Sequence, residues 1–234
     1  MNKIEFFSTI DGVAETFPII ETKRSMPSWV KVAQQEYKSL PTHGFHIARC
    51  PGIIDVMTTG YVVTAWHDIA VKSNPGGLET VVPDVQLEDL LEKPVVQVQS
   101  GDSVAKHIPK RPWSNKHILK INTPWHIISD CKFIMIPMPY TDQFEFESCI
   151  GILDPSISSE INIQGYVNGL GEFTIAAGTP LAQLIPMSQQ NYKLLVRDMN
   201  EKDSAWIKKR KFLNSISFSF NKTKVMNAYK KFFS

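Results

Sequence analysis

Glu145 and Glu147 are the acidic side chains whose spacing most directly suggests chemistry. They alternate with Phe144 and Phe146, so in a regular strand both carboxylates point to the same face. Two carboxylates at this spacing can exchange protons with a substrate or bind a hard cation. The same alternation is also typical of a strand with one face in solvent, and we prefer that interpretation.

His67, Asp68 and His126 are residue types that hold non-haem iron in a facial triad. His67 and Asp68 are adjacent on a predicted strand and therefore point to opposite faces, which argues against an iron site. The sequence contains no G-x-S-x-G, Walker A or G-x-G-x-x-G motif. The three cysteines have no C-x-x-C spacing, which favours reduced thiols in an intracellular protein. We expect no metal and no cofactor.

The C-terminal segment is basic and aromatic. Residues 202–234 hold nine Lys or Arg and one Asp, a net charge of 9 − 1 = +8, so residues 1–201 carry 2 − 8 = −6. This asymmetry suggests an anionic partner for the segment. We expect a docking helix, and nucleic-acid binding is the alternative. The predicted contact residues are Trp206, Lys208, Lys209, Arg210, Lys211 and Phe212.

The elements that carry these residues are predominantly strands. Residues 160–164 alternate polar and apolar side chains, and Asn168-Gly169 is a strong hairpin signal. Further short strands are predicted between residues 116 and 140, with a break at Thr123-Pro124, and one strand is predicted over residues 61–71. A helix is predicted to begin at Pro27. The fold class is therefore mainly β (α+β), with a β-barrel or jelly-roll core.

Three parts are expected along the chain. Residues 1–114 form an α+β segment packed on the core, residues 115–199 form the β core, and residues 200–234 form the helical arm. No apolar run approaches the roughly 18 residues of a membrane span, and the N-terminus lacks a secretory signal. We expect a protein that is neither membrane-bound nor secreted.

Residues 151–186 resemble the C-terminal half of the dUTPase and dCTP deaminase barrel. Gly151-Ile152-Leu153-Asp154 is similar to the third motif of that family, and the run from Gly178 to Leu184 is similar to its fourth. The resemblance implies a nucleotide hydrolase or deaminase that uses Mg²⁺. In such an enzyme Asp154 would orient a water or sugar hydroxyl, and Gln183 would face a phosphate.

The chain departs from that family at its second motif. The family has Pro-Arg-Ser where this sequence has Ile136-Pro137-Met138-Pro139-Tyr140, so no cation is present there for a triphosphate. A neighbouring subunit could supply one, for example through Arg197.

A second resemblance covers more of the chain. The succession of Cys50-Pro51, Gly60-Tyr61, Thr123-Pro124-Trp125 and Gly178-Thr179-Pro180 is similar to a family of uncharacterised proteins from tailed bacteriophages and some bacteria. It implies a location in the host cytoplasm or the virion. We expect a non-enzymatic phage-type protein that acts through protein contacts, as a homo-oligomer or with other phage proteins.

Overall fold

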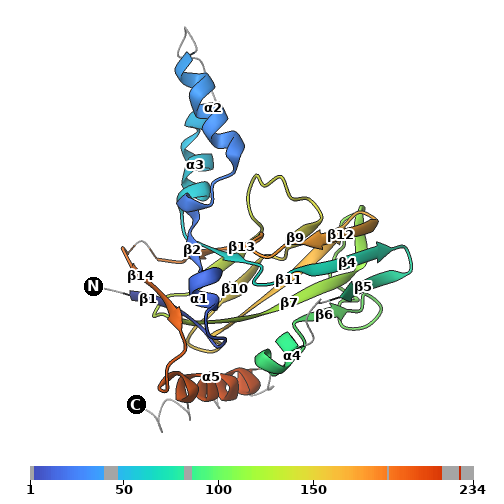
Figure 1. Ribbon diagram of the computed structural model, residues 1–234, viewed down its shortest axis with the longest axis vertical. Helices are drawn as coiled ribbons and strands as arrows, with labels where there is room; N and C mark the ends of the chain where they lie inside the picture. Colours follow the sequence, from blue (N-terminus) through green and yellow to red (C-terminus); the bar gives the residue numbers. More distant parts are fainter. Residues whose placement is uncertain (1–2, 40–46, 82–85, 189, 218–226, 228–234) are drawn as a thin grey trace.

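The protein is a sandwich of β-sheets with helices on its two outer sides (Figure 1). The computed structural model describes residues 3–39, 47–81, 86–188, 190–217 and 227. Sheet A has the order β14 (Lys193–Asp198), β1 (Lys3–Ser8), β7 (Ser114–Ile128), β11 (Glu160–Asn168) and β9 (Phe146–Ser148), and β6 (Val96–Gln99) also pairs with β7. Sheet B has the order β10 (Gly151–Leu153), β8 (Phe133–Ile136), β13 (Pro180–Pro186), β3 (Tyr61–Thr64) and β2 (Ile20–Glu21). Sheet C has the order β12 (Gly171–Ile175), β4 (Ile69–Asn74) and β5 (Gly77–Val81).

The helices are short, and they flank the sheets. They are α1 (Val13–Thr16), α2 (Ser28–Ser39), α3 (Pro51–Thr58), α4 (Gln86–Leu91) and α5 (Asp203–Ser217), with 3-10 turns η1 (Thr22–Arg24) and η2 (Ile47–Arg49). None of the helices within the described ranges is long and apolar enough to cross a membrane.

The core lies between sheets A and B. Ile4 and Phe6 point into it from β1 because alternate strand residues share a face. The Phe6 ring centroid lies 5.4 Å from that of Tyr61 and 6.4 Å from that of Phe133, both in sheet B. The mainly β class is confirmed. The sequence predicts either a β-barrel or a jelly-roll core. No closed barrel is found among the described strands, which form open sheets packed face to face.

Two predicted strand boundaries are wrong. β7 runs through Thr123-Pro124 without a break. The Thr123 hydroxyl donates to the Ile161 carbonyl, and the Pro124 carbonyl accepts from the Thr9 amide, so neighbouring strands satisfy the chain around the proline. The predicted strand over residues 61–71 is two strands, β3 and β4, which belong to different sheets.

The first two expected parts share one core. The first part supplies β1 to the middle of sheet A and β3 to sheet B, and β14 from the end of the second part pairs in parallel with β1. The predicted helix at Pro27 is confirmed as α2, which begins at Ser28.

The hairpin of α2 and α3 projects from the side of sheet B (Figure 1). Pro51 starts α3 after Cys50, whose carbonyl accepts the first helical hydrogen bonds. The buried Gln183 amide of β13 donates to the carbonyls of Val56 and Thr59 at the end of this helix, at 2.7 and 2.6 Å. Gly60 then turns the chain with φ +85°, at a point where a Cβ would lie 2.2 Å from the Leu184 carbonyl oxygen.

Helix α5 is fixed to the opposite side of the sandwich by its first turn. The Asn200 side chain accepts from the Lys202 amide, and the Asp203 carboxylate accepts from the Asn200 amide, which together form a capping box. Arg197 of β14 donates two hydrogen bonds to Asp203, at 2.6 and 2.9 Å, and one of 2.5 Å to Glu5 of β1. One guanidinium therefore joins β1, β14 and α5.

We predict that Arg197→Met lowers the free energy of unfolding by about 3 kcal/mol, because two largely buried carboxylates lose their common partner. Hydrogen bonds from Arg197 are the main reason that the pKa of Asp203 is lowered. For Glu5, burial acts to raise the pKa, but the hydrogen bonds from Lys3 and Arg197 outweigh it. Urea denaturation measures the difference.

The acid dependence provides a second measurement. Lowered carboxyl pKa values contribute stability that is present above the ordinary values of 4.5 for Glu5 and 3.8 for Asp203, and that is lost as the pH falls through the lowered values. The native chain should therefore lose stability more steeply below about pH 4.5 than the variant does. Parallel acid profiles for the two proteins would contradict this account.

Candidate protein-interaction surface

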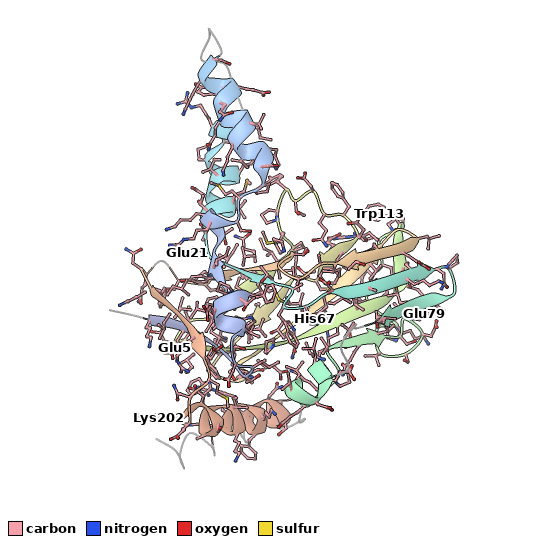
Figure 2. All side chains as sticks on the ribbon, viewed as in Figure 1. Glu5, Glu21, His67, Glu79, Trp113 and Lys202 are labelled. Atoms are coloured by element: carbon pink, nitrogen blue, oxygen red, sulfur yellow. The ribbon has the colours of Figure 1, made fainter. Side chains whose placement is uncertain are left out.

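Three large aromatic side chains lie exposed on one side of the sandwich. Trp113, Tyr140 and Phe144 are exposed by 62%, 48% and 73%, and together we call them the aromatic surface. Tyr140 and Phe144 belong to the β8–β9 loop, residues 137–145, and Trp113 precedes β7. Figure 2 places Trp113 on the side of the sheets from which α2 and α3 project. Burying such rings in the core would stabilise the fold, so their exposure calls for another explanation.

The β8–β9 loop contributes to the lining of two adjoining grooves. One, of about 440 Å³, is lined by Trp113, Pro137, Phe144 and Leu181 among others. The other, of about 480 Å³, includes Pro27, Met138, Phe173 and Pro180. Trp113, Tyr140 and Phe144 all line the first of these grooves and form a ridge along it, so a partner that fills this groove would contact all three rings.

Tyr140 is held in a costly backbone conformation. Its φ of 56° lies in the left-handed region, where residues other than glycine are uncommon. The Trp29 indole of α2 donates a 3.0 Å hydrogen bond to the Tyr140 carbonyl, and the two rings meet edge-on with centroids 6.2 Å apart. The helical hairpin therefore fixes the loop and keeps the Tyr140 ring at the surface.

The paired glutamates of the sequence lie beside this loop and have separate partners. Glu147 forms an ion pair with Arg111, whose guanidinium lies 5.3 Å from the Tyr166 ring centroid. The Glu145 carboxylate accepts from the Phe144 amide. Among the residues that the structure describes, no group of three His, Cys, Asp or Glu side chains is arranged to hold a metal ion.

Asp154 and Gln183 are placed apart. Asp154 follows β10, accepts from the Ser156 amide and hydroxyl, and pairs with Lys132 at 3.1 Å. Burial acts to raise the pKa of Asp154, but these contacts outweigh it and the pKa is lowered. Gln183 is two strands away on β13, and its amide hydrogens are engaged by the carbonyls of α3. The two side chains therefore have separate partners, and β10 and β13 are not neighbouring strands.

The predicted contact residues of the arm lie on α5, along the outer side of sheet A. Arg210 lies 4.0 Å from the Trp206 ring centroid and donates to the Ser156 carbonyl at 2.5 Å, so these two residues help to seat the helix. Lys208 and Lys211 line a cavity beneath it. Lys209 and Phe212 have exposed side chains. The other aromatic residues of the arm, Phe218, Phe220, Tyr229 and Phe232, are outside the described residues.

The aromatic surface escaped the sequence analysis. The alternation around Phe144 was recognised, but Tyr140 and Trp113 lie outside any periodic pattern, and long-range pairing of strands brings them together. The two prolines before Tyr140, Pro137 and Pro139, were a signal of an extended loop. Comparison with protein-family models, curated proteins and solved structures finds no match.

We predict that Trp29→Ala loosens the β8–β9 loop while leaving the sheets intact, because the indole hydrogen bond and the ring contact hold Tyr140 in place. Amide hydrogen exchange in residues 137–145 should accelerate by about tenfold or more, the equivalent of 1.4 kcal/mol. Val32→Ala, on the same helix with an exposed side chain, is the matched control. Equal exchange in both variants would show that Trp29 does not position the loop.

Proposed function

We propose that the chain acts through protein–protein contacts, as a structural or assembly component of bacteriophage type, and that the aromatic surface is its principal contact. The exposure of Trp113, Tyr140 and Phe144 on one ridge carries this proposal. Aromatic side chains dominate the energetics of protein interfaces because they bury a large area at little cost in conformational entropy. The left-handed backbone at Tyr140 supports it, since strain is retained at functional positions.

The shape of the molecule fits this role. The α2–α3 hairpin rises beside the aromatic surface and is joined to it through Trp29 (Figures 1 and 2). A partner seated on the ridge would meet the base of the hairpin as well, which enlarges the contact. On this proposal the protein works in the host cytoplasm or the virion, in a homo-oligomer or with other phage proteins.

The rival proposal is a nucleotide hydrolase or deaminase that uses Asp154, Gln183 and Mg²⁺. Asp154 is paired with Lys132, Gln183 donates to carbonyls at the end of α3, and Arg197 is held by Glu5 and Asp203, so the geometry lends this rival little support. Incubation with each deoxynucleoside triphosphate and magnesium tests it. Turnover that Asp154→Asn abolishes would overturn the proposal of a non-enzymatic protein.

We predict that the double variant Trp113→Ser/Phe144→Ser abolishes association while its melting temperature stays within a few degrees of the native value, because neither side chain contributes to the core. Light scattering coupled to size-exclusion chromatography measures self-association, and pull-down from phage-infected cells measures other partners. Val104→Ser, which removes a side chain exposed by 75% elsewhere, is the control. Association that survives the double variant unchanged would place the contact on another surface.

A further inference from the structure

A row of charged and aromatic side chains crosses the outer face of sheet A. Register pairs Arg197 of β14 with Phe7 of β1, Phe7 with His126 of β7, and His126 with Glu160 of β11. The Phe7 and His126 rings are stacked, with centroids 5.3 Å apart. Because these residues alternate with core residues along their strands, the row faces away from sheet B and toward α5.

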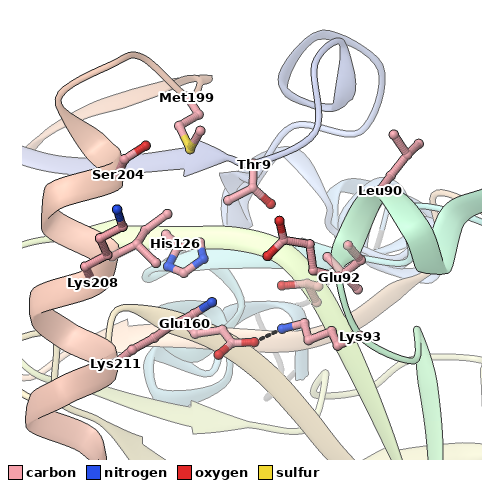
Figure 3. Close-up of a pocket in the computed structure, with 13 residues that line it drawn as sticks. Thr9, Leu90, Glu92, Lys93, His126, Glu160, Met199, Ser204, Lys208 and Lys211 are labelled. Carbon is pink, nitrogen blue, oxygen red and sulfur yellow. Dashed lines mark ion pairs between the residues drawn. The ribbon is translucent and has the colours of Figure 1, made fainter.

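Helix α5 and the end of α4 close a cavity of about 340 Å³ over this row. Lys211 reaches toward it from α5 and Lys208 lines its rim, both with solvent-exposed side chains, while Lys93 reaches in from the opposite wall and His126 lies on the floor (Figure 3). The volume is at the lower end of the range for sites that bind small molecules.

The cavity carries more positive than negative charge. Its lining holds three lysines and two glutamates, Glu92 and Glu160, which gives 3 − 2 = +1. Lys93 forms an ion pair with Glu160. Neither Lys208 nor Lys211 has an ion pair within the described part of the chain. Two ammonium groups on adjacent turns of α5 thus line a space in which Glu160 is paired with Lys93 and Glu92 is the other carboxylate.

Two groups in the cavity have lowered pKa values. Burial, with a smaller contribution from repulsion by Lys93 and Lys211, lowers the pKa of His126 to about 4. Burial is likewise the main cause that lowers the pKa of Lys93 to about 8, and Lys120 and Lys211 contribute by repulsion. Both imidazole and amine therefore resist taking up a positive charge, mainly because they are buried and in part because lysines lie nearby.

The wall of the cavity includes a second strained residue. Glu92, at the end of α4, has φ 56° and is one of two residues other than glycine with a positive φ among the described residues; the other is Tyr140 of the aromatic surface.

Ser204, in the first turn of α5, adds a hydroxyl to the lining. Ammonium groups, a hydroxyl and an imidazole can all donate hydrogen bonds to the oxygens of a phosphoryl group.

We propose that this cavity binds a small phosphorylated molecule, whose phosphate is held by Lys208 and Lys211 from α5 and by Lys93 from the facing wall. A phosphate at pH 7 carries up to two negative charges and would neutralise the excess positive charge of the lining. The site is separate from the aromatic surface, so it goes beyond a role in protein contacts and does not depend on it.

Isothermal titration of the full chain with pyrophosphate at pH 8 tests the proposal. Binding should weaken by about tenfold or more in Lys208→Ala and in Lys211→Ala, as expected for the loss of a hydrogen bond from a charged group. Lys106→Ala, which removes an exposed lysine that does not line the cavity, should bind as the native chain does. No binding at millimolar pyrophosphate, or equal loss in the control, would overturn the proposal.

Proton uptake on binding distinguishes a phosphate bound at Lys93 from nonspecific attraction of the anion to a positively charged surface. Because Lys93 has a pKa of about 8, a bound phosphate that raises this pKa makes the protein take up protons at pH 8, and the measured enthalpy then varies with the ionisation enthalpy of the buffer. Lys93→Arg should keep binding but lose this dependence, because arginine stays charged. Binding without proton uptake in the native chain would count against Lys93 as a ligand. If citrate bound as tightly as pyrophosphate, the cavity would not be specific for phosphate, and the proposal would be overturned.

Discussion

The contact on which the rest of the structure depends is the guanidinium of Arg197 between Glu5 and Asp203. Glu5 lies 192 residues before Arg197 in the chain, and Asp203 lies six residues after it. The three residues join the first strand, the last strand and the last described helix. The neighbouring Asp198 carboxylate accepts from the Gly12 and Ala14 amides at the start of α1. Arg197 therefore attaches α5 to β14, and the adjacent Asp198 attaches α1 to the same strand.

The position of α5 turns an ordinary sheet face into a cavity. Without the helix, the row from Phe7 to Glu160 would be an outer face of the sheet exposed to water. With it, His126 is buried and Lys93 is half-buried, and Lys211 adds a repulsion that lowers the pKa of both further than burial alone. The aromatic surface has an analogous origin, since Trp29 of the projecting hairpin holds the loop that displays Tyr140. In both places a residue other than glycine adopts a left-handed backbone where a helix meets a loop or wall.

Local patterns were sufficient for the elements but insufficient for their assembly. The alternation of residues 160–164 identified β11, and Pro27 identified the start of α2, because burial on one face and helix initiation are properties of neighbouring residues. The basic helix was found in the same way. The row beneath it was not, because the pairing of Phe7 with His126 and of His126 with Glu160 depends on register between strands more than a hundred residues apart in one case. Pro124 misled the prediction because a side-chain hydroxyl and a neighbouring strand satisfy the ladder around it.

The run from Gly178 to Leu184 shows how one motif admits two interpretations. Taken by resemblance, its glutamine would face a phosphate. In this fold the amide of Gln183 is buried and donates both of its recorded hydrogen bonds to carbonyls at the end of α3, so the residue closes a helix that would otherwise leave those carbonyls unpaired. Gly178, with φ +85°, makes the turn that leads into β13. These residues are needed to attach the hairpin that supports the aromatic surface, and that requirement alone accounts for a polar side chain in the middle of a buried strand. The phosphate site that we propose uses lysines on the opposite side of the sandwich, two of which, Lys208 and Lys211, belong to the basic run that the sequence singled out for contact with a partner.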